Sequence, residues 1–335
     1  NKMKIETSNY KQLAFEEKTA YKNAIQKIKN ESHTHFLQEY NLLGSLRNGK
    51  HSIEETLQAK LEDYVYRFEL KDFFIKNGLY LTLLLFMIVC VCITPSVLSI
   101  NSIMMITQNF SYKIFYALGV AGLILLGGTD LSVGRMVTLG TLITCMSLNP
   151  DTTVSFFGIR LADMYSTLGV AGTAIIALIL SILMCTLFSA VAGFFSAKFK
   201  IHPFISTLAT SLTIWGLCAV GTNTIKTGGI STDASKIGGF IGSSGTGTSY
   251  FVGFPITIIY AVVIIAIVSL IWNKTKFGKY LYAVGGNPEA ASVSGISVFW
   301  VTMGAFIMAG VLYGMGGFVT GLIGGSSDSA YGQGW

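Results

Sequence analysis

Residues 274–296 read KTKFGKYLYAVGGNPEAASVSGI, and this basic segment, punctuated by glycine, separates two long apolar runs. Long apolar runs are typical of membrane spans, so the segment is a connection between spans. Gly285 and Gly286 form a turn signal. Asn287, directly after them, is a favourable N-cap, and Pro288 suits the first position of a helix. The segment therefore predicts a turn followed by the start of a helix.

The predicted helix runs from Pro288 to Ser294 and is about 10 Å long at roughly 1.5 Å per residue. Glu289 suits its positive end, and Gly295 takes the usual position after its last turn. Its face carries small side chains: Ala290, Ala291 and Val293. Such a helix, held between two spans, can insert into a cleft on another protein. The alternative is a capped turn that only links the two spans.

The composition of the chain is typical of an integral membrane protein. Hydrophobic residues make up 51% of the 335 residues and charged residues 12%, against about 25% charged in a soluble domain. Most of the charged residues precede Asn77. We therefore predict a soluble helical leader over residues 1–76 and an all-α polytopic membrane domain over residues 77–335. The connecting loop of interest within that domain is 273–297.

Seven apolar runs are candidates for membrane-spanning helices, since about 20 apolar residues cross a bilayer. They cover residues 79–100, 113–128, 131–148, 169–197, 203–221, 255–272 and 298–319. If the spans alternate, one side receives the leader and these lysines: Lys198, Lys200, Lys274, Lys276 and Lys279. By the positive-inside rule that side is the cytoplasm, so the N-terminus is cytoplasmic and residues 149–168 and 222–253 face outward.

The leader has apolar residues at roughly helical spacing. The stretch Leu43 to Gly49, with Gly44, Asn48 and Gly49, is expected to interrupt the first helix. A capping box at Ser52 and Glu55 opens the next one. Two readings of the leader stay open: a segment with no separate activity, or a docking or regulatory element.

A second motif, GGTDLSVGR at residues 127–135, lies between two apolar spans. Charges are costly at membrane depth, so Asp130 and Arg135 are candidates for function. In the alternative interpretation, Asp130 caps a helix that begins at Leu131, and Arg135 lies near the cytoplasmic interface. The glycines also permit a broken helix whose backbone groups lie beside a pathway. The residues of this gating or structural motif are Gly127, Gly128, Asp130, Ser132, Gly134 and Arg135.

These motifs resemble bacterial sugar ABC-transporter permeases of the ribose/galactose branch, nearest to its galactose/methylgalactoside members. The likeness is carried by GGNPEAASVSGI at 285–296, GGTDLSVGR at 127–135 and AGVLYGMGGFVTGLIGGSS at 309–327. It runs from about Leu79 to Trp335. Relatives usually have about ten helices, so the resemblance implies that this chain is truncated at its C-terminus. It also implies a structural or gating role for the GGTDLSVGR motif.

The resemblance further implies a multi-pass protein of the bacterial inner membrane with three kinds of protein partner. A second copy of the permease completes the pathway, and an extracytoplasmic sugar-binding protein docks on the outward loops. A cytoplasmic ATP-binding cassette ATPase docks on residues 285–296. The residues assigned to this coupling role are Gly285, Gly286, Asn287, Pro288, Glu289, Ala290, Ala291, Ser294 and Gly295.

The sequence offers little support for catalysis. The five cysteines lie in apolar runs without metal-ligand spacing. The sequence has no Walker A loop, so ATP hydrolysis requires a separate subunit. We therefore expect no catalytic residue, no cofactor, no metal and no nucleic-acid partner. Two rival functions stay open: a permease for ribose, xylose or nucleosides, and an ion-coupled transporter or channel, which predicts more intramembrane acids than Asp130 alone. Residues that bind substrate are not identified.

Overall fold

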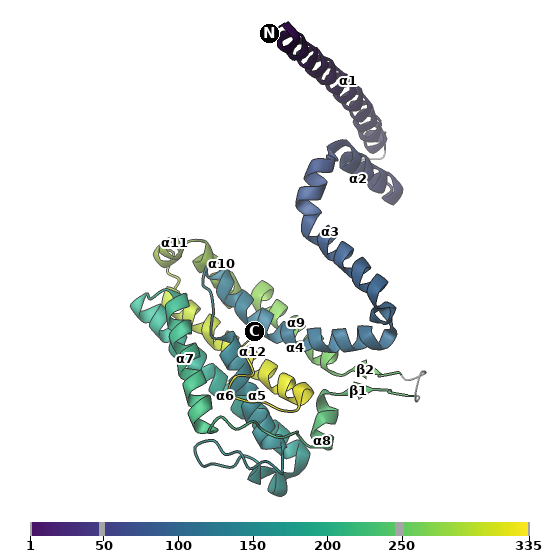
Figure 1. Cartoon of the computed structure of the whole chain (residues 1–335). Coiled ribbons are helices and arrows are strands. Elements are labelled where there is room, and N and C mark those ends of the chain that lie inside the picture. Colours follow the sequence, from purple (N-terminus) through teal and green to yellow (C-terminus); the bar gives the residue numbers. More distant parts are fainter. Residues whose placement is uncertain (1, 47–50, 245–250, 334–335) are drawn as a thin grey trace. The chain divides into compact units, whose positions relative to one another are not determined.

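The computed structural model describes residues 2–46, 51–244 and 251–333. The chain forms two compact units, Asn1–Thr94 and Pro95–Trp335 (Figure 1). Composition divides the chain at Asn77, whereas the first compact unit continues to Thr94 and so includes the first apolar helix. The assignment of 1–76 as a leader remains a prediction.

The first unit consists of three helices: α1 (Lys2–Leu46), α2 (Ile53–Arg67) and α3 (Leu70–Ile93). The predicted capping box is confirmed, with the Ser52 N–H donating to Glu55 Oε2 over 2.9 Å. Tyr66 joins α2 to α1, because its hydroxyl donates to Asn30 Oδ1 over 2.8 Å and its ring stacks on His33. The break predicted over Leu43 to Gly49 is wrong at Gly44, because α1 continues to Leu46. The rest of that prediction, at Asn48 and Gly49, lies outside the described residues.

The regular secondary structure of the second unit is almost entirely helical in its described residues, which confirms the all-α prediction. Its elements are η1 (Pro95–Leu98), α4 (Ile100–Leu125), α5 (Val133–Leu148), α6 (Asp163–Phe199), α7 (Pro203–Gly221), α8 (Thr232–Ser235), η2 (Lys236–Gly238), β1 (Phe240–Ile241), β2 (Phe254–Pro255), α9 (Thr257–Lys274), α10 (Lys276–Gly286), α11 (Pro288–Val293) and α12 (Val298–Gly324). The two short strands pair antiparallel.

Each of the seven predicted spans contains a helix, but only five of these helices, among the described residues, are long and apolar enough to cross a membrane. They are α3, α6, α7, α9 and α12. The span predicted at 79–100 instead begins at Leu70 and ends at Ile93. Pro95 explains this end, since the residue before a proline avoids the helical conformation.

α12 lies at the centre of the second unit and packs against α4, α5 and α6. Glycines let its backbone approach its neighbours closely, as is common in membrane helices. A Cβ at Gly317 would lie 2.7 Å from the Cα of Gly140 on α5. One at Gly314 would overlap the backbone of Ile182 on α6.

α5 is buried at every residue from Met136 to Leu148, although it carries many hydroxyl side chains. These hydroxyls donate to carbonyl oxygens one turn earlier in the same helix. The pairs are Thr138 to Gly134, Thr141 to Val137, Thr144 to Gly140 and Ser147 to Ile143. Because each hydroxyl is satisfied locally, its burial costs little.

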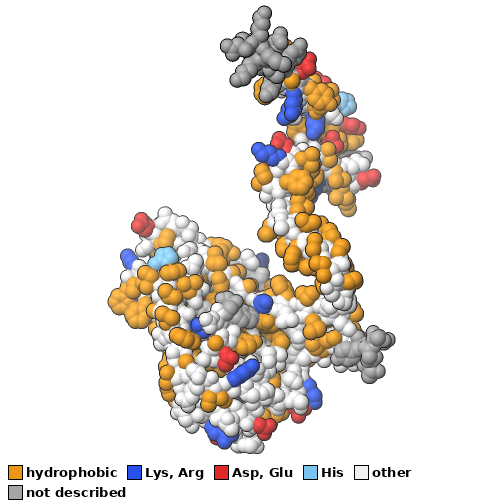
Figure 2. Space-filling view, in the orientation of Figure 1, with side chains coloured by type: hydrophobic (Ala, Val, Ile, Leu, Met, Phe, Trp, Pro, Cys, Tyr) orange, Lys and Arg blue, Asp and Glu red, His pale blue; other side chains and the backbone are white. Residues whose placement is uncertain are grey.

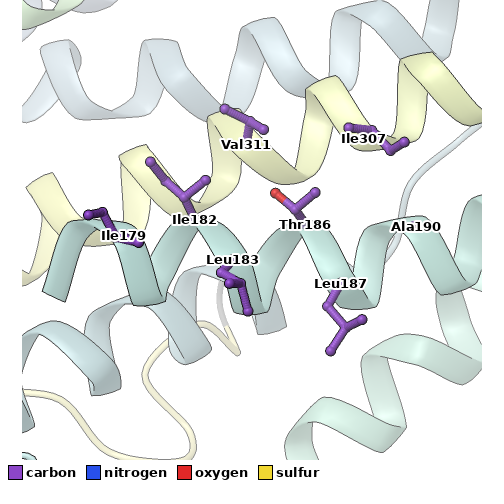
Figure 3. Close-up of a pocket in the computed structure, with 8 residues that line it drawn as sticks. All are labelled: Ile179, Ile182, Leu183, Thr186, Leu187, Ala190, Ile307 and Val311. Carbon is purple, nitrogen blue, oxygen red and sulfur yellow. The ribbon is translucent and has the colours of Figure 1, made fainter. Parts of the chain in front are cut away.

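Hydrophobic side chains are exposed along the long helices of the second unit, and Figure 2 shows them over α7. A shallow groove of about 570 Å³ between α6 and α12 is lined by aliphatic side chains and one hydroxyl, that of Thr186 (Figure 3). Such an apolar surface suits contact with the hydrocarbon core of a membrane. It offers too few polar groups to bind a sugar.

Candidate functional site

The basic segment after α9 forms a helix, α10, which the sequence analysis did not predict. The Thr275 hydroxyl caps it by accepting a hydrogen bond from the Gly278 N–H over 3.3 Å. Gly278, Leu281 and Val284 are its buried residues. Their spacing of three residues is the helical signal that the sequence contained.

α11 is the short capped helix that the sequence predicts, one residue shorter at its end. Asn287 Oδ1 accepts from the Ala290 N–H over 3.0 Å, and Pro288 is the first helical residue. Ser294 is the C-cap, and Gly295 follows with a φ of 81°. That left-handed backbone favours glycine.

The exposed face of α11 differs from the predicted one. Ala291 is buried and packs into the main hydrophobic cluster, whereas Ala290 is exposed. Val293 is 91% exposed, more than any other large hydrophobic residue whose exposure the structure describes. Glu289 and Ser292 are exposed as well. The surface that α11 offers to a partner is therefore an exposed aliphatic side chain among polar ones.

Gly285 joins this segment to the end of α4. A Cβ at Gly285 would overlap the carbonyl oxygen of Leu125, whereas a Cβ at Gly286 would meet nothing within 4 Å. α4 ends at Leu125 and leads into the GGTDLSVGR motif. Gly285 is therefore packed against the backbone that directly precedes the GGTDLSVGR motif.

A cavity of about 1150 Å³ opens beside α11. One wall comes from α11 and the start of α12, and the opposite wall from the connection between α6 and α7 together with the end of α4. The polar or turn residues in its lining are Gly128, Ser196, Lys200, His202, Asn287, Glu289, Ser292, Ser297 and Thr302. The cavity therefore joins Gly128 of one predicted motif to Asn287, Pro288 and Glu289 of the other.

Asp130 organises the rest of the GGTDLSVGR motif. Its Oδ1 accepts from the Ser132 N–H over 2.7 Å and from the Ser132 hydroxyl over 2.6 Å. Its Oδ2 accepts from the Tyr313 hydroxyl of α12 over 2.8 Å. The predicted helix start at Leu131 is wrong, because Asp130 and Ser132 form a turn and α5 begins at Val133.

Two further contacts hold this motif. Gly127 has a φ of 75°, which glycine adopts readily, and the Leu131 N–H donates to Thr207 Oγ1 on α7 over 3.1 Å. The guanidinium of Arg135 lies 5.5 Å from the centre of the Trp215 ring, also on α7. Trp215 is about 18 Å along α7 from Pro203, at 1.5 Å per residue. The Arg135 guanidinium is thus well inside the helical layer.

The sequence identified both motifs but not their partners. Tyr313, Thr207 and Trp215 lie far from the motif in sequence and had no assigned role. A tyrosine in the glycine-rich apolar run GVLYGMGG was the available signal for Tyr313, since a buried tyrosine hydroxyl usually finds a hydrogen-bond partner.

Comparisons with known proteins agree with this architecture. The family model described as "branched-chain amino acid transport system / permease component" matches residues 102–335. The galactose/methyl galactoside import permease protein MglC of Treponema pallidum is 45% identical over 280 residues, which are 82% of this chain and 52% of that protein. MglC of Escherichia coli is 32% identical over 76% of this chain and 73% of its own length. The ribose import permease protein RbsC of Haemophilus influenzae is 27% identical over 75% and 70%.

The chain therefore spans about half the length of the Treponema relative and about three quarters of the Escherichia one. No solved structure matches it. The apolar helices, the glycine-packed α12 and the exposed α10–α11 corner define a polytopic membrane permease. Within that class, the chain belongs to the permease family of bacterial sugar ABC importers, in the branch that contains the galactose/methylgalactoside and ribose import permeases.

Proposed function

We propose that this chain is the transmembrane subunit of an ATP-driven importer of galactose or methylgalactoside, with glucose as a further substrate. The proposal rests on the sequence similarity to MglC proteins and on one structural observation. That observation is the exposed, capped helix α11 beside an open cavity. The protein provides a route across the bacterial inner membrane and hydrolyses no ATP itself.

In this proposal α11 is the contact for a separate ATPase subunit. Val293, which is almost fully exposed, offers an apolar side chain to a partner, and Glu289 and Ser292 offer polar groups around it. Gly285, at the end of α10 directly before α11, contacts Leu125, which leads into the GGTDLSVGR motif. In this proposal, movement of α11 reaches α7 and α12 through that motif.

Two further partners complete the proposal. A second permease copy forms the other half of the pathway. An extracytoplasmic sugar-binding protein docks on residues 149–168 and 222–253 and supplies most of the selectivity for sugar. The N-terminus and α11 lie on the cytoplasmic side.

Co-purification of the ATPase tests the coupling role. Ala290→Arg places a large cation on the exposed face of α11, and we expect it to abolish co-purification of the ATPase with the full-length permease. Thr232→Arg is the control, because Thr232 is exposed on α8, at the opposite end of α5 from the cavity. Normal ATPase recovery with Ala290→Arg would refute the assignment of α11.

Uptake measurements test the substrate. We expect ATP-dependent uptake of radiolabelled galactose by cells that express the full-length permease with its ATPase and binding protein. Uptake of ribose alone would reassign the chain to the ribose group. Transport by the purified permease in liposomes without ATP would favour an ion-coupled transporter or channel and contradict the importer.

A further inference from the structure

Helix α2 carries its large hydrophobic side chains on one side. They recur at helical spacing along α2 and at its C-cap: Ile53, Leu57, Leu61, Tyr64 and Phe68. At roughly 100° per residue these five positions fall within a stripe about 80° wide. We call them the α2 stripe. Every one of them is exposed, from 38% at Phe68 to 82% at Ile53.

α1 packs on the opposite side of α2. Among the described side chains of α2, the half-buried ones are Glu55, Thr56, Ala59, Glu62, Asp63 and Tyr66. Tyr66 contacts α1 at Asn30 and His33. It lies about two and a half turns after Leu57, and so on the side of α2 away from the stripe. α2 therefore turns its more polar side toward α1 and its apolar side outward, the reverse of a helix packed on a hydrophobic core. Among the described residues of this unit, none buries the stripe.

α2 ends close to a candidate membrane span. α3 begins at Leu70, and the residues between the two helices, Phe68 and Glu69, have extended backbone with ψ of 113° and 123°. The chain bends there (Figure 1). The residue steps from Arg67 to Leu70 cover at most about 11 Å. The covalent chain itself thus holds α2 beside the start of α3, whatever precedes or follows these residues in the protein.

The start of α3 lies near the level of the lipid headgroups. Lys76 is the last charged residue of α3, so the hydrocarbon begins after it. Leu70 is about 9 Å from Lys76 along the helix, and the headgroup layer is roughly 5–8 Å thick on each side of the bilayer. A helix with its side chains has a radius of about 5–6 Å. At the level of Leu70, α2 therefore reaches the headgroup layer with the side chains of whichever side faces the bilayer.

Aromatic rings connect the α2 stripe to the beginning of α3. The rings of Tyr64 and Phe68 have their centres 5.9 Å apart. The ring of Phe73, in the first turn of α3, lies 5.6 Å from that of Phe68 and 5.9 Å from that of Phe74. Tyr64, Phe68 and Phe74 are all exposed. Aromatic side chains concentrate at the interface between membrane and water. The side of α2 that continues into the span is therefore its apolar side.

We propose that α2 is an interfacial helix that lies along the membrane surface, with the α2 stripe inserted among the lipids and α1 on its water side. α2 has four acidic and two basic residues, so burial of apolar area, and not attraction to anionic lipids, holds it there. The exposed Lys60 borders the stripe, where its methylene groups remain in apolar surroundings while its ammonium reaches a phosphate. This placement requires α3 to cross the membrane and is independent of the transported solute.

Spin labelling of the full-length permease in proteoliposomes tests this placement. Cys90 and Cys92 are first replaced by serine, and this parent protein measures background labelling. Nitroxides are then attached at single cysteines introduced by Leu57→Cys and Leu61→Cys. Both positions are exposed and lie outside the contact with α1, so the substitutions leave α1 and α2 packed together.

Gln38→Cys is the matched control in the same unit. Gln38 is exposed on α1, shortly before Tyr40, whose ring stacks on that of His51 at the beginning of α2. Gln38 and Tyr40 are about half a helical turn apart, so Gln38 lies on the side of α1 away from α2. In the proposed arrangement its label is in water.

Molecular oxygen concentrates in lipid, whereas nickel ethylenediaminediacetate stays in water. We expect the ratio of oxygen collisions to nickel collisions to be roughly threefold or more higher at both stripe positions than at Gln38→Cys, in phosphatidylcholine alone as well as with added anionic lipid. Ratios equal to the control would place the stripe in water and overturn the proposal. Exclusion of both reagents from the stripe would mean that a protein covers it, which would overturn the proposal too. A high ratio that requires anionic lipid would overturn apolar insertion as the cause.

Discussion

The two adjacent glycines at the end of α10 differ in the space available for a side chain. Gly285 lies against the Leu125 carbonyl, where no side chain fits, and Gly286 faces open space. Sequence alone presents them as one turn signal. Their difference depends on a contact between residues 160 positions apart in the chain (285 less 125).

We therefore predict that Gly285→Ala lowers thermal stability and sugar uptake and that Gly286→Ala leaves both close to wild type. Forcing an extra carbon into a packed contact costs about 1–3 kcal/mol. Thermal unfolding in detergent measures the stability, and uptake by cells measures the coupling. Equal behaviour of the two variants would contradict the close contact between α10 and α4.

At the scale of elements, glycines hold α12 against α5 and α6. Gly314 is in contact with the backbone around Ile182, whereas Gly216 on α7 has open space beside it. Both are glycines inside long apolar helices, so composition does not separate them.

We expect Gly314→Ala to destabilise the protein by about 1–3 kcal/mol, because α6 and α12 must move apart. Gly216→Ala should instead be neutral or stabilising, by up to about 1 kcal/mol, because alanine favours helix over glycine. Size-exclusion chromatography after heating distinguishes the two variants, since the less stable one loses its monodisperse peak at a lower temperature. A stable Gly314→Ala protein would argue against the packing of α12 on α6.

Local signals predicted some elements well and others poorly. The cap of α11 follows from Asn287 and Pro288, which are neighbours in sequence, and the structure has the same cap. α10 was missed because its basic residues and glycines concealed the spacing of Leu281 and Val284. The predicted start of α5 at Leu131 was wrong, because Asp130 accepts hydrogen bonds from Ser132 and Tyr313 and the helix begins only at Val133. The first error was a misread local pattern, whereas the second depends on a tertiary contact.

At the scale of the whole molecule, the direction of insertion is a prediction from the lysines between spans. Lys200 lies at the turn between α6 and α7, and Thr232 lies on α8 near the opposite end of α5. The positive-inside rule places Lys200 in the cytoplasm and Thr232 outside.

We expect an impermeant thiol reagent to label Thr232→Cys in intact spheroplasts and Lys200→Cys only after permeabilisation, with Cys90 and Cys92 replaced by serine. Measuring both variants in both preparations controls for reactivity. The reverse pattern would invert the orientation, and with it the cytoplasmic location proposed for α11.

The burial of α5 from Met136 to Leu148 has a consequence for biosynthesis. α5 is synthesised before α6, α7 and α12, which cover it. It has 16 residues and is rich in hydroxyls, so it partitions weakly into lipid by itself. After Leu148, the end of α5, the ribosome must add 150 residues to reach Val298, the first residue of α12 (298 less 148). Within that interval α6 and α7 cover only part of the nascent helix, so the arrival of α12 is the step that completes its burial.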